Sequence, residues 1–203
     1  MPVADEPSAM PPSRRVLLRS TGVVLAGLGG CAAGYGPPHR PGPEECPDSP
    51  RMPDGDPHPD GADLPPVPDP PAELDEASAV AYAEAFELAR EWRATTATYD
   101  GPVTKVRTEA TARASRVDDE TVLVELPTVT PSGRVGSEGN AGDPIHFDGW
   151  RYSASYLVTT EAVWRAESER GSEYPPPPDP VDDGRVVACF EPPRQSLGSR
   201  AGY

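Results

Sequence analysis

The sequence predicts an α+β domain over residues 73–191, in which one N-terminal helix packs on a curved antiparallel sheet of four to five strands. Two observations indicate this fold. One long helical pattern opens the range, and segments with alternating apolar and polar residues follow it. Helices and strands that occur in separate blocks, instead of in alternation, are typical of α+β folds.

The helix is expected to begin after Asp75 and to continue to about Ala94. Asp75 is a favourable N-cap, and Leu74 and Ala79 are spaced as a hydrophobic staple. Apolar residues recur at helical spacing, namely Ala79, Tyr82, Ala83, Phe86, Leu88, Ala89 and Trp92. The remaining positions define an expected polar side, formed by Glu84, Glu87, Arg90 and Glu91.

After residue 102 the spacing of apolar residues changes from helical to alternating. Residues 103–117 and 121–126 are predicted to form an antiparallel hairpin with one solvated face. A polar loop at 127–144 follows. The remaining strands are expected on either side of a tight turn near Thr160 and after a break at 174–180, at residues 147–158, 163–166 and 185–190.

Residues 32–72 are predicted to form an extended, disordered stalk. They contain 14 of the 29 prolines and eight acidic residues, with almost no large apolar side chain. Such a segment does not bury enough apolar surface to offset the entropy of ordering it. Residues 192–203 are expected to form a disordered tail.

The first 31 residues have the features of an export signal. Ser13-Arg14-Arg15-Val16-Leu17-Leu18-Arg19 resembles the twin-arginine consensus, and an apolar run at residues 20–30 follows it. That run is too short to span a bilayer, which needs ~20 apolar residues. It ends in Leu28-Gly29-Gly30-Cys31, which resembles a lipobox and so implies lipid attachment at Cys31. The alternative is an ordinary cleaved signal with an incidental cysteine.

Two further resemblances concern the domain. The helix-then-strands order is similar in outline to cystatin-like and nuclear-transport-factor-like folds. Together with Tyr156-x-Val158 and Val186-x-Ala188-Cys189-Phe190, it also resembles uncharacterised lipoproteins of halophilic archaea. Neither resemblance implies a particular activity.

The composition is strongly acidic. The chain has 33 acidic and 18 basic residues, a net charge of -15, and Lys105 is its one lysine. Because phosphate contacts need a basic surface, nucleic acid is excluded as a partner. Acid-rich, lysine-poor usage favours a halophilic protein, in which molar salt screens the repulsion among carboxylates. The alternative is the amino-acid bias of a GC-rich genome.

Two cysteines remain if Cys31 carries lipid. Cys46 lies early in the predicted stalk and Cys189 in the last predicted strand. Outside the membrane an even pair is a candidate disulfide, and the alternative is two unpaired thiols.

A Cys46–Cys189 bond would reorganise the predicted stalk. The free tether would shorten to residues 32–45, and residues 47–72 would run back over the domain. Leu64 and Val67 would then pack against the sheet or the helix, which would explain two apolar residues in an otherwise polar stretch.

The chain contains no Gly-x-Ser-x-Gly, no His-Glu-x-x-His, no Cys-x-x-Cys and no Gly-rich loop that ends in Lys-Ser/Thr, so neither an enzyme nor a cofactor is expected. His146 and Asp148 would share one face of a strand and could form an acid–base pair, although any strand would place such residues together. Between Asp54 and Gly61 the acidic spacing partly matches a calcium loop. Val67 stands where the final glutamate should be, which favours a hydrated acidic segment without a metal.

The aromatic residues Trp150, Tyr152 and Tyr156, together with Trp164, are interpreted mainly as core. The alternative is a pocket on the concave face of the sheet, formed by His146, Asp148, Trp150, Arg151 and Tyr156. Two functions follow. We favour a lipid-anchored protein on the outer face of the cell membrane, with a small non-catalytic domain for binding an envelope protein or for envelope structure. The alternative is a ligand-binding or hydrolytic domain that uses the pocket.

Overall fold

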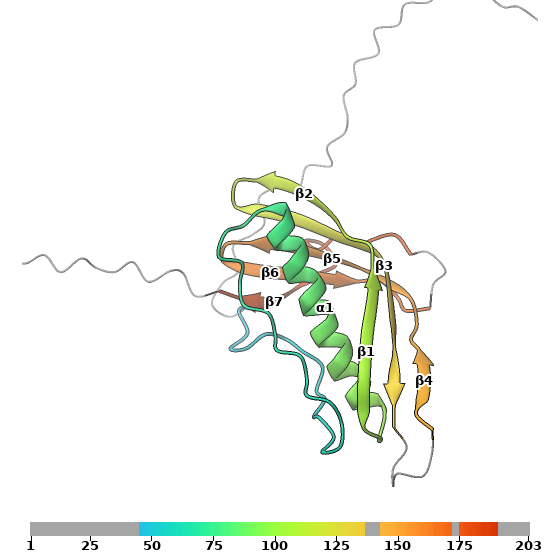
Figure 1. The fold of residues 1–203 in the computed structure, drawn as a ribbon. Helices are drawn as coiled ribbons and strands as arrows, with labels where there is room; N and C mark the ends of the chain where they lie inside the picture. Colours follow the sequence, from blue (N-terminus) through green and yellow to red (C-terminus); the bar gives the residue numbers. More distant parts are fainter. Residues whose placement is uncertain (1–44, 137–142, 172–174, 191–203) are drawn as a thin grey trace, which may run out of the picture. The chain divides into compact units, whose positions relative to one another are not determined.

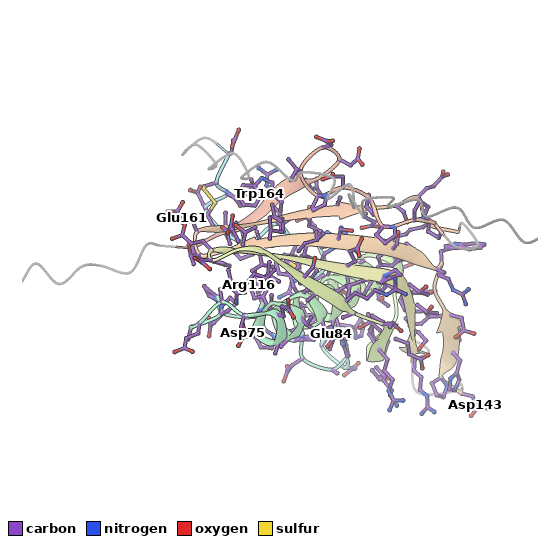
Figure 2. All side chains as sticks on the ribbon, turned by 90° about the horizontal axis from the view of Figure 1, so that it is seen from above. Asp75, Glu84, Arg116, Asp143, Glu161 and Trp164 are labelled. Carbon is purple, nitrogen blue, oxygen red and sulfur yellow. A yellow bond between two sulfur atoms is a disulfide. The ribbon has the colours of Figure 1, made fainter. Side chains whose placement is uncertain are left out.

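The computed structural model describes residues 45–136, 143–171 and 175–190. In this part of the chain one helix lies against a curved, antiparallel sheet, and the two layers are visible in Figure 1 and Figure 2. The predicted α+β fold is therefore confirmed. No helix in the described ranges has both the length and the apolar character needed to cross a bilayer. The predicted export signal and C-terminal tail lie outside the described residues.

Helix α1 (Glu76–Thr98) begins where the capping residues predict. The Asp75 carboxylate accepts a hydrogen bond from the Ser78 amide at 2.7 Å, and the Ser78 hydroxyl accepts one from the Asp75 amide at 2.9 Å. This reciprocal pair satisfies two amides that a helix leaves unpaired at its start. The helix continues past the predicted end at Ala94, whose carbonyl accepts a hydrogen bond from the Thr98 hydroxyl.

Seven strands form the sheet: β1 (Val103–Ala110), β2 (Arg113–Asp118), β3 (Thr121–Val135), β4 (Ile145–Asp148), β5 (Tyr152–Thr159), β6 (Ala162–Glu167) and β7 (Arg185–Cys189). The hydrogen-bonded order is β1-β3-β5-β6-β7. Strand β3 also pairs with β2 along the edge that it shares with β1, and with β4 along the edge that it shares with β5. The long strand β3 therefore organises the whole sheet.

The structure corrects the predicted strand boundaries at three places. The expected strand 103–117 is divided into β1 and β2, and the expected strand 147–158 is divided into β4 and β5. The expected polar loop 127–144 begins as the second half of β3. The division of two strands explains why the sheet has more than the predicted four or five.

Local chemistry accounts for two of these corrections. Pro127, which has no amide hydrogen to donate, lies where the register of β3 against β5 shifts between Leu126 and Val129. At the end of β4 the Gly149 amide donates to the Pro131 carbonyl at 2.8 Å. A Cβ at Gly149 would come within 2.8 Å of the Pro131 ring, so this close approach requires glycine.

The main core lies between α1 and the facing side of β3 and β5. Its aromatic part joins the two layers, because the rings of Phe86 and Tyr156 meet edge to face with centroids 6.0 Å apart. Tyr152 and Tyr156 have no exposed surface, which confirms their interpretation as core residues, whereas the same interpretation is wrong for Trp150, which is exposed after the end of β4. Trp164 lies on the side of the sheet away from the helix (Figure 2).

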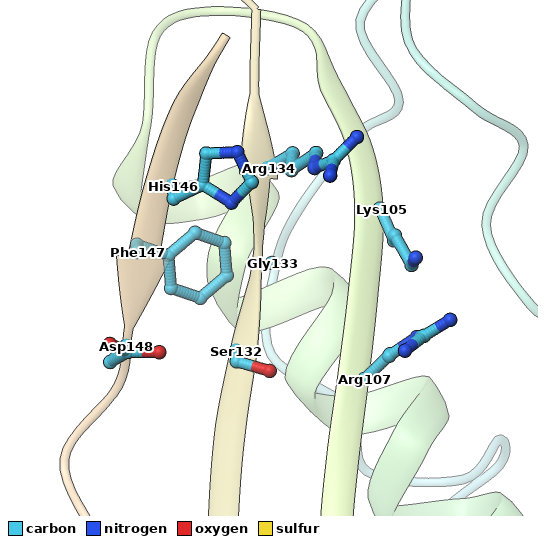
Figure 3. Close-up of a pocket in the computed structure, with 8 residues that line it drawn as sticks. All are labelled: Lys105, Arg107, Ser132, Gly133, Arg134, His146, Phe147 and Asp148. Atoms are coloured by element: carbon cyan, nitrogen blue, oxygen red, sulfur yellow. The ribbon is translucent and has the colours of Figure 1, made fainter.

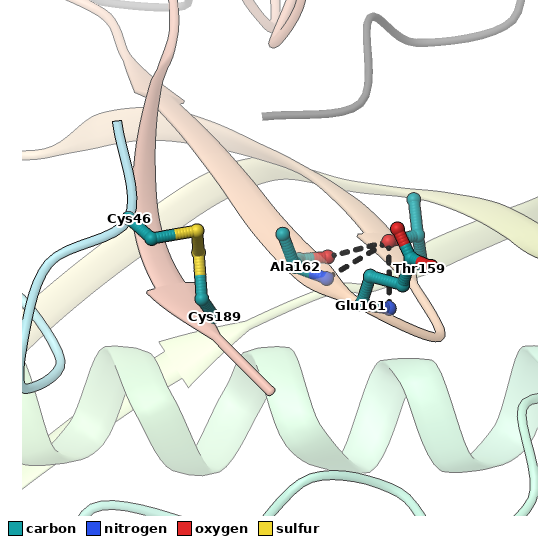
Figure 4. The surroundings of a disulfide bond; sticks show 5 residues. All are labelled: Cys46, Thr159, Glu161, Ala162 and Cys189. Carbon is teal, nitrogen blue, oxygen red and sulfur yellow. Dashed lines mark hydrogen bonds between the residues drawn. A yellow bond between two sulfur atoms is a disulfide. The ribbon is translucent and has the colours of Figure 1, made fainter. Parts of the chain in front are cut away.

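Cys46 and Cys189 form a disulfide, with their Cα atoms 5.6 Å apart (Figure 4). The predicted bond is thus confirmed. Cys189 lies at the end of β7, in register with Ala162 at the start of β6. The turn from β5 to β6 is closed beside the disulfide by Thr159, whose hydroxyl oxygen accepts hydrogen bonds from the amides of Glu161 and Ala162.

The segment that follows the disulfide, residues 47–72, crosses the domain, and we call it the strap. The Arg51 amide donates to the Val187 carbonyl of β7 at 2.7 Å, and the Ala62 amide donates to the Val103 carbonyl of β1 at 2.9 Å. Because β1 and β7 stand at opposite ends of the strand order, the strap connects both edges of the curved sheet.

The strap also packs on the helix and the core. Val67 and Leu64 contact the two clusters of buried apolar residues, as expected if the disulfide forms. Gly55 lies so close to α1 that a Cβ there would come within 2.1 Å of the Arg93 carbonyl oxygen. The extended stalk predicted for residues 32–72 therefore does not apply to the strap, because the disulfide and these contacts hold it, and residues 32–44 lie outside the described residues.

Candidate functional site

The interface between helix and sheet contains a cluster of charged side chains that the sequence pattern did not reveal. Six residues from α1, β6 and the segment after β6 form it, and we call them the buried charge network: Glu87, Arg90, Glu91, Arg165, Glu167 and Arg170. The prediction that Glu87, Arg90 and Glu91 lie on a solvent-exposed polar side of the helix is wrong, since all three are buried.

Glu87 is the centre of the network. The Arg165 guanidinium donates to both of its carboxylate oxygens, at 2.6 Å from Nη2 to Oε1 and 3.0 Å from Nε to Oε2. The hydroxyls of Tyr152 and Tyr156 also donate to Glu87, the former at 2.6 Å. Such a bidentate, charge-assisted arrangement is the strong form of an ion pair.

The other acids are paired as completely. Glu91 shares the single Tyr152 hydroxyl proton with Glu87, at 2.8 Å from the hydroxyl oxygen, and accepts a hydrogen bond from Arg170 at 2.7 Å. Glu167 contacts three arginines, which are Arg90, Arg165 and Arg170 at 3.1, 2.8 and 2.7 Å. Three carboxylates therefore face three guanidinium groups, and the network is electrically balanced.

Burial and pairing act on the acids in opposite directions. Burial alone raises the pKa of Glu87, but the Arg165 guanidinium and hydrogen bonds from Arg165 and both tyrosines outweigh it and hold that pKa at about 2. The pKa of Glu167 is lowered for the same reason, because Arg165 and Arg170 outweigh its burial. Burial, and then the Glu87 carboxylate, raise the pKa of both tyrosines well above the usual value. At neutral pH the two carboxylates are charged and the tyrosines keep their protons.

Because the acidic and basic groups of the network pair with one another, we interpret the network as a structural element. Breaking a buried ion pair by removing one partner costs about 3–5 kcal/mol, since the other charge stays buried and unpaired. A signal for it does exist in the sequence. Tyr152 and Tyr156 lie four residues apart on one face of the same strand, and a buried tyrosine hydroxyl needs an acceptor. Glu87 and Glu91, one helical turn apart, supply those acceptors.

A second group of charges lies on the opposite side of the sheet, on β1, β3 and β4. We call Lys105, Arg107, Arg134 and His146 the cationic face (Figure 3). Its side chains point away from the helix, because the alternate residues Val106, Val135 and Phe147 belong to the cluster that packs on Trp92 and Leu88.

Strand register brings these side chains together. Arg134 on β3 lies directly opposite Lys105 on β1 and opposite His146 on β4. The next row along the strands contains Arg107, Ser132 and Asp148. Like charges directly opposite each other destabilise a sheet. Within the described ranges Lys105, Arg107 and Arg134 form no ion pair that would offset this repulsion.

The cationic face surrounds a shallow depression of about 220 Å³. Gly133 lies in it between Ser132 and Arg134, and its missing side chain leaves room for the Phe147 ring, which a Cβ would approach within 2.5 Å. In the part of the chain that the structure describes, no hydrogen bond links Ser132, His146 and Asp148. The arrangement therefore presents cations to an anion and does not assemble a nucleophile with a base.

The residues predicted to share a pocket are not all brought together. His146 and Asp148 line the depression, whereas Tyr156 is fully buried beside Glu87. Trp150 is 73% exposed, and Arg151 lies between β4 and β5, where its carbonyl accepts a hydrogen bond from the Gly171 amide. The separation results from the break between β4 and β5, which the alternating pattern did not predict.

The acidic stretch of the strap presents no metal site. Gly61 and Asp60 form a local turn, in which their amides donate to the carbonyl oxygen and the imidazole of His58. The described residues contain no group of three or more histidine, cysteine or acidic side chains placed to hold a metal ion.

Comparison with known proteins gives no relatives: the chain matches no protein-family model, no curated protein and no solved structure.

Proposed function

We propose that this protein is an exported lipoprotein, anchored through Cys31 at the outer face of the cell membrane, whose domain is a non-catalytic binding module. The disulfide between Cys46 and Cys189 carries the proposal. Disulfides persist in oxidising compartments outside the cytosol, and this one lies on a chain whose first 31 residues resemble a twin-arginine signal with a lipobox.

The position of the disulfide leaves only a short segment of chain between the proposed lipid anchor and the domain. It fixes the chain to the domain at Cys46, and 14 residues separate this position from Cys31. Such a segment spans at most ~50 Å when fully extended. An anchored domain would consequently stay near the lipid headgroups, with its strap folded against it.

The cationic face is the surface that best fits a binding role. Three cations that form no ion pair within the described ranges lie together on a chain of net charge -15. Their mutual repulsion is relieved when an anionic partner binds. The buried charge network, in contrast, leaves no charge for a ligand.

The anchor is tested by Cys31→Ser in the organism that produces the protein. We expect the variant to move from the membrane fraction to the medium, or to remain unprocessed. Cys46→Ser together with Cys189→Ser is the matched control, because it removes two cysteines and leaves the lipobox intact. A Cys31→Ser protein that still fractionates with membranes at unchanged size would contradict the proposal.

The export route is tested separately by Arg14→Lys together with Arg15→Lys, which should block secretion. Unchanged secretion would indicate the general pathway.

Mass spectrometry of the non-reduced, protease-digested protein should show a linked peptide that contains Cys46 and Cys189. Two freely alkylated thiols would remove the support that the disulfide gives to an extracytoplasmic location.

A further inference from the structure

The cationic face borders an unusual concentration of exposed apolar side chains. Ile145 at the start of β4 and Trp150, two residues after its end, are 61% and 73% exposed, more than any other large apolar side chain in the described ranges. Tyr99, at the end of α1, is also exposed and lies against Phe147 of β4, with ring centroids 5.3 Å apart. Of the exposed large apolar residues in these ranges, Val181 alone lies elsewhere.

Strand β4 is also an edge of the sheet. It pairs with β3, and no other strand of the described chain pairs with it. Figure 1 shows it at the periphery of the domain. An object that approaches this edge on the side of the cationic face meets His146 and the neighbouring cations of β3 and β1, and Trp150 follows two residues after the end of β4. Ile145 is in register with Val135 and therefore lies on the other side of the strand, with Phe147.

Cations combined with an exposed tryptophan are the chemistry of contact with a bilayer surface. Lysine and arginine bind anionic headgroups, while tryptophan partitions to the interface between headgroups and acyl chains. The depression itself is open and shallow, and therefore suits a surface of many anionic groups better than one enclosed small molecule.

We propose that the edge formed by β4 and the cationic face is a membrane-docking surface, which binds the anionic phosphate headgroups of the bilayer that holds the lipid anchor. This inference rests on the proposed function, since the ~50 Å tether keeps the bilayer within reach. Docking at β4 gives the domain a second attachment beside the lipid at Cys31. It also fixes which side of the domain faces outward, with β2 and β7 away from the membrane.

The test uses the full chain with Cys31→Ser, so that no lipid contributes to binding, and measures sedimentation with vesicles. Vesicles of phosphatidylglycerol present anionic headgroups, and vesicles of phosphatidylcholine are the zwitterionic comparison. In this background the docking variant carries Lys105→Glu, Arg107→Glu and Arg134→Glu. The matched control carries Arg51→Glu, Arg113→Glu and Arg185→Glu, which make the same change of net charge at exposed positions elsewhere. Any contribution from residues 1–30 is common to all proteins.

We expect the parent protein and the matched control to sediment with anionic vesicles, and the docking variant to bind at least about tenfold more weakly at ~0.1 M salt. Trp150→Ala should weaken binding as well, and its effect should persist at ~1 M salt, where the Debye length is about 3 Å and the charge contribution is small. Because three reversed charges affect folding in some proteins, Lys105→Gln with Arg134→Gln is the milder variant, and it should show an intermediate loss.

Three results would overturn the docking surface. The first is that the docking variant and the matched control bind anionic vesicles equally, and the second is that the parent protein binds both vesicle types equally. The third is that the parent binds soluble heparin, or forms a dimer through these residues, without binding vesicles. Each of them leaves the anchor test with Cys31→Ser unaffected, so failure of the docking surface is distinguishable from failure of the proposed function.

Discussion

The two sides of the sheet handle charge in opposite ways. On the helix side, three carboxylates and three guanidinium groups are paired with one another. Four of these six side chains are buried, namely Glu87, Arg90, Glu91 and Arg165. On the other side, Lys105, Arg107 and Arg134 are packed side by side and have no ionic partner in the described chain. The first arrangement is costly to disturb, whereas the second carries only a small repulsion, which an external anion would relieve.

This difference separates stability from recognition within one sheet. The network is electrically balanced, so it fixes the position of the helix on β5 and β6 and leaves no net charge for a ligand. Unpaired surface cations contribute little to folding, because solvent screens them. Substitutions in the two regions should therefore affect different measurements.

The largest effect is expected for Arg165→Met. Loss of the guanidinium leaves Glu87 buried without its main partner, and the free energy of unfolding should fall by about 3–5 kcal/mol. Urea denaturation at neutral pH measures it, with Arg113→Met on the exposed side of β2 as the control, which should change stability by less than ~0.5 kcal/mol. Adding Glu87→Gln to Arg165→Met should recover part of the loss. A cost for Arg165→Met alone that matches the control would show that the network is not structural.

Acid should destabilise the protein through the same residue. The pKa of Glu87 is about 2 in the folded state against an ordinary value of 4.5, so its contribution is present above pH 4.5 and is lost as the pH falls toward 2. The shift corresponds to about 3 kcal/mol. Urea denaturation at neutral pH and at decreasing pH should show a weaker acid dependence in Glu87→Gln. Glu84→Gln, exposed on the same helix, should retain the dependence of the parent, and an identical loss in both variants would contradict the assignment.

Salt should affect the exposed charges of the protein more than the buried charge network. The thermal midpoint is expected to rise by several degrees between dilute buffer and molar KCl, because salt screens the repulsion among the excess of exposed carboxylates. The buried pairs are screened much less. A midpoint that stays flat or falls would argue against salt adaptation and favour compositional bias as the origin of the acidic sequence.

The smallest effect on stability is expected from the cationic face. Replacing Lys105, Arg107 and Arg134 together by glutamine should change the free energy of unfolding by less than about 1 kcal/mol. A slight stabilisation is the expected direction, because like charges no longer lie opposite each other. Urea denaturation is again the measurement. A loss of several kcal/mol would show that these residues hold the sheet together, and would weaken the argument that they serve a partner.

The sequence alone predicted the features that depend on neighbouring residues. The start of α1 follows from Asp75 and the apolar spacing after it, and the alternation after residue 102 predicts antiparallel strands. The disulfide followed from counting the two cysteines left after Cys31. Its consequence, a strap whose Leu64 and Val67 pack on the domain, followed as well.

Tertiary structure alone decided which distant residues meet. Glu87 looked like a solvent-facing residue because a helical pattern does not reveal that Arg165, 78 residues away, will lie beside it. The cationic face depends on register, since a shift of one residue in β4 would turn His146 to the other side of the sheet. Local periodicity determines which elements form, whereas pairing between remote strands determines which charges become partners and which remain available to a ligand.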